Sequence, residues 1–365
     1  MVSPNRRQPE TAPLSRHPMN NALSRRICLV PALRGVGGMV SFQQRLAAGL
    51  HRRGYVVCYD LADLPYAAVL VVGGTRQVSA LRRIKRRGVP IVQRLDGMNW
   101  LHRLLPTGLR HRLRAEYGNR LLALIRARLA DRIVYQSGFA RGWWESAYGA
   151  TPVPSSVVYN GVDLELFNPA GPHDRPADRW RILLVEGSLM GGYELGLEAA
   201  EAMGALLAEQ LTPDAPGVEL VIVGRVASSV REHWDGRSRL PLTWMGQMPP
   251  ERIPQIDRSA HLLYSADINA ACPNSVIEAM ACGLPVVAFD TGALYELVQD
   301  GAGSLASYGG DPWRLDPPDV AALAVAARQL LEDQDSHRRA ARLRAEAAFG
   351  LDAMVDGYLQ ALLPA

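Results

Sequence analysis

DINAACPNSVIEAMACGLPVVAFDTGALYELV, the stretch from Asp267 to Val298, decides the fold of this chain. It starts as a loop, continues as a short helical run, and turns at Gly283 into the apolar strand 285–289. Gly292 then marks a turn before another helix. A short helix that returns directly into a fully apolar strand is typical of a parallel sheet with both faces covered.

The sequence on either side of this stretch alternates between apolar strands and amphipathic helices. In the first half, the predicted strands are 27–32, 55–59, 67–72, 90–95, 133–136 and 157–160, and the predicted helices follow residue 38 and cover 80–87, 101–130 and 139–148. In the second half, the predicted strands are 182–186, 219–223, 262–265 and 285–289, and the predicted helices reach to 209 and cover 250–258, 294–298, 320–332 and parts of 336–363. The residues between 223 and 250 read as a Pro-rich loop. Such alternation indicates an α/β architecture with parallel sheets.

The length of 365 residues favours two domains, each large enough to bury its own core. Residues 1–24 are polar and Pro-rich, and we expect them to form a disordered leader. A stretch rich in Pro, Asp and Gly separates the two alternating series. We therefore predict a first domain over 25–170, a linker over 171–180, a second domain over 181–345 and a C-terminal helix over 346–365. The two domains would be Rossmann-like and would face each other across a cleft, where such folds bind ligands.

Composition narrows the class of protein further. The net charge is only +4, and Lys85 is the sole lysine among 40 basic residues. Neither a signal peptide nor an apolar run of 18 residues is visible, so we expect a cytoplasmic protein without a membrane span. Cysteines without metal-ligand spacing agree with a reduced compartment. They are Cys28, Cys58, Cys272 and Cys282.

The run CPNSVIEAMACGLPVVAFDTG resembles the donor-nucleotide motif of family 4 glycosyltransferases, which are retaining enzymes of GT-B fold. NGVDLELFNP at 160–169 resembles the segment that closes the first domain in that family. QRLDGMNWLHR at 93–103 and VYQSGFARGWWESAYG at 134–149 resemble one bacterial branch of it. The resemblance extends over about residues 26–360. It implies an acceptor-binding first domain, a nucleotide-sugar-binding second domain and a C-terminal helix that packs back on the first domain.

Glu278 is the residue on which the resemblance bears most directly. In the family, a carboxylate at this position binds the ribose hydroxyls of the donor. The local sequence offers a second interpretation, because Ser275 and Glu278 fit the capping box S-x-x-E, in which the acid only caps its helix.

Asn274, Ser275 and Val276 stand at the predicted start of the same helix. Their backbone N–H groups would point at a ligand, and a helix N-terminus attracts phosphate. The resemblance implies contact with the sugar and diphosphate of the donor, whereas an ordinary capped helix is the alternative.

Two departures from the family motif limit the prediction. The acid that usually precedes Glu278 by eight positions, and holds the transferred sugar, is Ala270 here. Asn269 or backbone N–H groups would have to replace it. The basic pair that usually follows the first strand of the second domain is also absent, since Ser188 stands there. Arg225, at another strand end, is our candidate for the diphosphate, although a solvated surface arginine is as good an interpretation.

Three further residues are weaker donor-site candidates. Gly37 and Gly38 lie in the first strand-to-helix turn and permit close approach of the backbone to a phosphate or sugar, although a plain tight turn explains them almost as well. Glu296 matches a family position that contacts the nucleotide, and it is equally a first-turn helix acid.

Asp96 and Arg94 end a predicted strand at the cleft and are our candidate catalytic residues. The resemblance places this loop at the reaction centre, where Asp96 would orient the acceptor hydroxyl or accept its proton. Asp-Gly is also a common turn pair. Asn99 and His102 are secondary candidates in the same loop.

Residues 101–132 carry eight arginines against Glu116 and Asp131. A basic amphipathic helix suits peripheral membrane contact, which family members use to reach lipid-linked acceptors, while a solvated helix is the simpler interpretation. No nucleic-acid-binding module is recognised.

The sequence thus predicts a retaining glycosyltransferase that moves a sugar from a nucleotide-diphosphate donor to a hydroxyl of a glycan or lipid-linked acceptor, with cell-surface polysaccharide as the expected product. No cofactor and no metal are expected, because no metal-binding acidic pair is evident. One alternative is a nucleotide-sugar-binding or scaffold protein with degenerate chemistry, which Ala270 motivates. A nucleotide-sugar epimerase is a third hypothesis, and it lacks the expected cluster of acids and a His.

Overall fold

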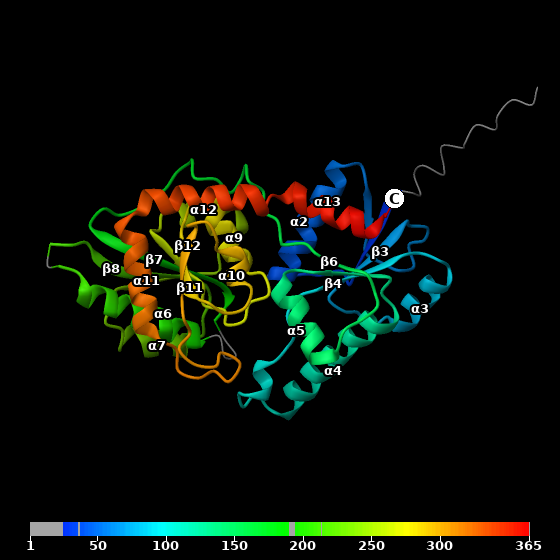
Figure 1. Ribbon diagram of the computed structural model, residues 1–365, viewed down its shortest axis with the longest axis horizontal. Coiled ribbons are helices and arrows are strands. Elements are labelled where there is room, and N and C mark those ends of the chain that lie inside the picture. The colour runs from blue at the N-terminus through cyan, green and yellow to red at the C-terminus, as the bar shows by residue number, and fades with distance from the viewer. Residues whose placement is uncertain (1–24, 36, 190–193, 213, 365) are drawn as a thin grey trace, which may run out of the picture.

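The computed structural model describes residues 25–35, 37–189, 194–212 and 214–364. Over these ranges the chain forms two parallel six-stranded sheets, each covered by helices (Figure 1). The fold class predicted from the sequence, two Rossmann-like domains, is confirmed. The predicted leader, 1–24, lies outside the described residues.

The first sheet has the strand order β2-β1-β3-β4-β5-β6. Its strands are β1 (Arg26–Val30), β2 (Val56–Cys58), β3 (Ala68–Val72), β4 (Ile91–Leu95), β5 (Arg132–Tyr135) and β6 (Ser155–Val157). Its helices are α2 (Gly38–Arg52), α3 (Val78–Arg86), the 3₁₀ turn η1 (Leu101–Arg103), α4 (Leu109–Arg128) and α5 (Gly138–Tyr148). The central strands β3 and β4 are buried at every residue, as expected for a sheet covered on both faces.

The second sheet has the order β12-β11-β10-β7-β8-β9. Its strands are β7 (Arg179–Ser188), β8 (Gly217–Arg225), β9 (Leu242–Gly246), β10 (Leu262–Tyr264), β11 (Val286–Phe289) and β12 (Gly303–Ala306). Its helices are α6 (Glu194–Gln210), α7 (Ser228–Asp235), η2 (Pro250–Arg252), α8 (Ile253–Arg258), α9 (Asn274–Ala281), α10 (Leu294–Leu297), α11 (Val320–Glu332) and α12 (Gln334–Ala348). Separate clusters of buried apolar side chains line the two faces of this sheet.

Two predictions of local structure were wrong, and one strand was missed. The Pro-rich loop expected between 223 and 250 contains α7 and β9. The sequence also gave no sign of β12, whose residues GSLA include two poor strand formers. The single helix expected over 101–130 is divided, because the chain after η1 turns at Pro106 and Gly108 before α4 begins.

The chain passes between the domains twice, and the two passages lie side by side. Val162 N–H donates to Phe349 O at 2.8 Å, and Leu351 N–H donates to Val162 O at 2.9 Å. A side chain at Gly161 would lie 2.9 Å from the Leu351 Cα atom, so only glycine fits there. Beyond this point α13 (Leu351–Leu362) packs on α2, as predicted for the C-terminal helix (Figure 1).

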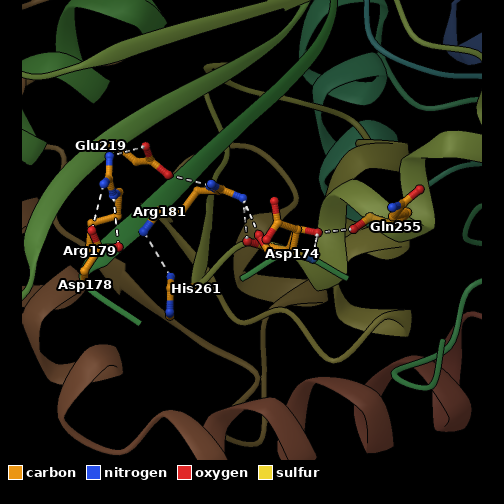
Figure 2. A network of polar contacts seen from close by, with 8 residues as sticks. Asp174, Asp178, Arg179, Arg181, Glu219, Gln255 and His261 are labelled. Atoms are coloured by element: carbon orange, nitrogen blue, oxygen red, sulfur yellow. Dashed lines mark hydrogen bonds and ion pairs between the residues drawn. The ribbon is translucent and has the colours of Figure 1, made fainter. Parts of the chain in front are cut away.

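The predicted linker is attached to the second domain by a polar network centred on Arg181 (Figure 2). Arg181 donates from Nε to Glu219 at 2.6 Å and from Nη1 to the carbonyl of Asp174 at 2.7 Å. Its backbone N–H donates to Nδ1 of His261 at 3.0 Å. Burial and the neighbouring arginines lower the pKa of His261 to about 4, which keeps its imidazole neutral as an acceptor. These contacts hold the linker at Asp174 against the second domain.

Candidate active site

Two helix N-termini meet where the two domains face each other, at the place of the cleft that the sequence predicts. Helix α2 starts at Gly38 and α9 at Asn274, and the side-chain Nδ2 of Asn274 donates to the Gly38 carbonyl oxygen at 3.5 Å. Neither helix has a side-chain cap or an acid in its first turn. Their first intrahelical bonds run from Ser41 to Gly37 and from Ile277 to Pro273. The N–H groups that precede those bonds are therefore open to a ligand, and both helix dipoles favour an anion between them.

The predicted donor residues Asn274, Ser275 and Val276 lie at this start of α9. The capping-box interpretation was wrong, because Pro273 occupies the N-cap and the helix begins one residue before Ser275. Gly37 has φ 133° and ψ 166°, a conformation reserved for glycine, and it turns the chain into α2.

Glu278 lies one turn further along α9 and is almost fully buried. Its Oε1 accepts a hydrogen bond from Arg45 of α2, which closes an ion pair between the two domains. Arg45 also donates to the Gly161 carbonyl oxygen at 3.3 Å. Burial raises the pKa of Glu278, whereas Arg45 lowers it. Among the described residues only Arg45 donates to this carboxylate, so Oε2 is available to a ligand.

Asn160 connects the two sides of the cleft and was missed as a site residue. Its Nδ2 donates to the Cys272 carbonyl oxygen at 3.0 Å and to Oδ1 of Asn274 at 2.9 Å. Its Oδ1 accepts from Arg94 Nη2 at 3.3 Å. Asn160 thereby joins the strand end that carries Arg94 to the start of α9. Asn160 is the first residue of NGVDLELFNP, a segment that resembles the family. That position was the one signal in the sequence that could have marked it as a site residue.

Asp96 and Arg94, the predicted catalytic residues, end β4 on the first-domain side of the cleft. Arg94 is 1% exposed, stacks 3.9 Å from the Phe42 ring centroid and lies 3.7 Å from Oδ2 of Asp96. Burial raises the pKa of Asp96, and the Arg94 charge opposes that rise. The structure therefore allows Asp96 to meet a substrate, while Arg94 lies beneath it.

The secondary candidates in the same region attach their loop to α4. His102 Nε2 lies 3.0 Å from Oε1 of Glu116, and the Asn99 N–H donates to Oδ1 of Asn119 at 3.1 Å. Both pairs hold the loop after Asp96 in place.

Glu296 lies in the first turn of α10, as its helix-acid interpretation expected, and reaches across to the first domain. Its carboxylate accepts from the N–H groups of Gly138 at 2.8 Å and Phe139 at 2.5 Å, and from the Tyr159 hydroxyl at 3.0 Å. It therefore supplies a charged cap to α5 from the other domain.

Two carboxyl groups lie where β7 and β10 end. Strand β10 pairs in parallel with β7, so Asp267 follows β10 beside Glu186. Burial, followed for Glu186 by the charge of Asp267, raises the pKa of Glu186 to about 8 and that of Asp267 to about 7. Asp267 lines a small pocket with Trp100 of the first domain and Leu315 of the second.

Two family models match this chain. "Glycosyltransferase Family 4" matches residues 70–166, and "Glycosyl transferases group 1" matches residues 187–333. The chain therefore carries two glycosyltransferase domains, one of each family. The family resemblance drawn from the sequence is confirmed.

Known proteins similar to this glycosyltransferase agree with that family. The D-inositol 3-phosphate glycosyltransferase of Nocardia farcinica is 30% identical over 222 residues, which cover 58% of this chain and 47% of that protein. The chain spans about half the length or less of the curated relatives it matches. Among solved structures, sucrose-phosphate synthase from Thermosynechococcus elongatus superimposes with a TM-score of 0.70 at 18% identity, over 92% of this chain and 98% of that one. Anabaena HepE in complex with UDP and glucose gives 0.67 at 17%, over 93% and 99%.

The structure shows where the two departures from the family motif lie in the second domain. Ala270 is buried and its backbone packs against Gly292. A side chain at Gly292 would come within 2.6 Å of both the N and the O atom of Ala270. Arg225 lies exposed at the end of β8, where Ser188 is its register partner on β7. Over the described residues no group of three or more His, Cys, Asp or Glu could hold a metal ion. No helix in the same ranges is long and apolar enough to cross a membrane.

Proposed function

We propose that this protein is a retaining glycosyltransferase that takes a nucleotide-diphosphate sugar in the cleft between its two domains. One observation carries the proposal: the open N-termini of α2 and α9 converge next to the buried carboxylate of Glu278. A diphosphate requires N–H donors and positive dipoles, and a ribose diol requires a charged acceptor. The cleft offers both within one turn of α9.

Different residues bind different parts of the donor. The N–H groups of 274–276, with the Gly37–Gly38 turn opposite, hold the diphosphate. Oε2 of Glu278 accepts from the ribose hydroxyls, while Arg45 opposes the rise in the carboxyl pKa that burial causes. Arg225 is placed for a phosphate oxygen from the end of β8. We assign Glu296 to positioning α5, because its oxygens already accept three hydrogen bonds.

The chemistry is electrostatic. As the bond between sugar and diphosphate breaks, charge grows on the phosphate and is stabilised by the preorganised N–H groups of α9. The acceptor hydroxyl attacks from the face of departure, and the leaving phosphate takes up its proton. Asp96 orients that hydroxyl, and Arg94 positions Asp96 from below through the 3.7 Å ion pair.

HepE was solved with UDP and glucose, which makes UDP-sugars the first donors to test. The sugar itself is held here without an acid at 270. We propose that Asp267 and Glu186, near the ends of β10 and β7, and the buried Asn269 replace the missing contact.

The acceptor is proposed to be a hydroxyl of a glycan or of a lipid-linked saccharide, reached at the inner face of a membrane. Leu109, Leu113 and Tyr117 recur every fourth residue on α4 and are 72%, 62% and 55% exposed. Arg110 and Arg114 flank this apolar stripe. Such a surface suits an anionic bilayer. Sedimentation with anionic vesicles should carry down the wild type but not a Leu113→Glu variant, and equal sedimentation would argue for a solvated helix.

The function is tested by incubating the protein with a panel of nucleotide sugars and with saccharide acceptors extracted from cells. Transfer that keeps the anomeric configuration of the donor, read by NMR of the product, supports the proposal. The alternative function is a nucleotide-sugar-binding protein without catalysis. It is favoured by the buried Ala270, which stands where the family has an acid. Donor binding without hydrolysis or transfer would establish that alternative instead.

A further inference from the structure

The segment 307–319 joins β12 to α11 and reaches from the second domain to the first (orange in Figure 1). Its Trp313 is 37% exposed and contacts aromatic side chains of the first domain. No role for this tryptophan was predicted from the sequence.

Three aromatic side chains of the first domain receive Trp313. Its ring centroid lies 4.8 Å from that of Trp143, at 63°, and 5.3 Å from that of Trp100, at 70°. Phe139 stacks on it at 5.9 Å and 16°. Edge-to-face and stacked pairs at these separations are attractive beyond the apolar area they bury. The contacts therefore favour a closed arrangement of the two domains.

Hydrogen bonds within the segment hold its shape. The Trp313 N–H donates to Oδ1 of Asp311 at 2.9 Å, and the Asp311 N–H donates to Oδ2 of Asp316 at 3.0 Å. The two ends of the segment are joined by a hydrogen bond, which the Asp319 N–H donates to the Tyr308 carbonyl oxygen at 2.8 Å. Trp313 is thus presented by a preformed loop, so little ordering cost opposes its docking.

The docking point adjoins the reaction centre. A side chain at Gly97 would lie 2.7 Å from the Trp143 ring, so that ring packs directly on the residue after Asp96. Leu315, two residues after Trp313, lines the pocket that also holds Asp267 and Trp100. Glu296 binds the start of α5 beside Phe139, so a second tie between the domains meets at the same place.

We propose that segment 307–319 is a clasp, and that Trp313 is a positioning residue that closes the cleft over the donor sugar. This inference rests on the proposed function. With the clasp closed, Trp313 and Leu315 keep bulk water from the sugar carbon, so that the acceptor hydroxyl and not water forms the new bond. With the clasp open, the donor can enter and the nucleotide can leave.

The test compares Trp313→Ala with Trp244→Ala, a tryptophan of the outer strand β9 that pairs with Asp235. Because Trp313 is more than a third exposed, its removal does not hollow out a core, and circular dichroism checks the fold. Small-angle scattering should show a larger radius of gyration for Trp313→Ala only. Trp313→Phe should restore the wild-type profile.

The catalytic readout is the ratio of donor hydrolysis to transfer at saturating acceptor. It should rise several-fold in Trp313→Ala, fall back in Trp313→Phe and stay unchanged in Trp244→Ala. An unchanged scattering profile overturns the clasp, and an unchanged ratio overturns its role in excluding water. If the wild type neither binds nor turns over nucleotide sugars, the proposed function fails, while the scattering comparison still decides the clasp.

Discussion

Arg45 of the first domain and Glu278 of the second form an ion pair across the cleft, and each side chain is less than one fifth exposed. The pair holds a carboxylate in a place where burial alone would favour its neutral form. It also brings α2 and α9 together, so that the geometry of the donor site depends on both domains.

Replacing Arg45 with methionine should weaken donor binding in a pH-dependent way. Without the guanidinium the pKa of Glu278 rises further, and a protonated carboxyl accepts poorly from ribose hydroxyls. We expect weaker donor binding near neutral pH, which recovers as the pH rises over the range from neutral to alkaline and the carboxyl ionises. Calorimetric titration across that range measures it. Arg52→Met, an exposed position on the same helix, should bind like the wild type.

Gly37→Ala should disturb the turn into α2 through the backbone alone. No atom lies within 4 Å of the added methyl group, but φ of 133° with ψ of 166° strains any other residue by about 1–3 kcal/mol. Chemical denaturation should show that loss of stability. A separate binding titration should show weaker binding of nucleoside diphosphate. Gly142→Ala is the matched control. It lies inside α5 with open space around it, so the same substitution should stabilise by about 0.5–1 kcal/mol. Equal stability of the two variants would show that the turn is not strained.

Asn160→Asp should uncouple the first domain from the start of α9. The substitution keeps an acceptor for Arg94 but removes the donor to the Cys272 carbonyl oxygen and to Asn274. Losing such buried contacts costs about 1–3 kcal/mol. The melting temperature should fall and KM for the donor should rise. Asn168→Asp, at the far end of the same segment, should leave KM unchanged.

The carboxyl pair Glu186 and Asp267 should make stability depend on pH. Their folded pKa values of about 8 and about 7 exceed ordinary unfolded values near 4, so the folded state binds more protons between those limits. Stability is therefore highest at the acid end and falls as the pH rises through the folded pKa values. Asp267→Asn should stabilise the protein by about 1–2 kcal/mol near pH 8, or roughly 2–8 °C, and flatten the profile.

Thermal melts across the pH range measure this effect. Asp290→Asn, an exposed acid at the end of β11, controls for the change in net charge. A profile of Asp267→Asn that falls as steeply as that of the wild type would contradict the shared burial of the pair.

The local parts of the site were predictable from the sequence, and the parts made by contact between domains were not. The start of α9 and Glu278 belong to one continuous motif. Arg45 lies 233 positions before Glu278, and Asn160 lies 114 before Asn274. The helical spacing of apolar residues in α2 predicts that one face of the helix is buried. It does not predict which acid Arg45 pairs with. β9 was missed because an edge strand of five residues, exposed in part, carries little apolar pattern.

The most direct test of the account is the affinity for nucleotide sugars of the wild type and of Glu278→Gln. Thermal shift with UDP-, GDP-, ADP- and dTDP-sugars identifies the nucleotide, and calorimetry then gives both dissociation constants. The amide keeps the size of the side chain but loses a charged acceptor, which is worth about 1.5–3 kcal/mol, so binding should weaken roughly tenfold to a hundredfold. Undiminished affinity in Glu278→Gln would show that the ribose does not bind there and would contradict the assignment of the cleft.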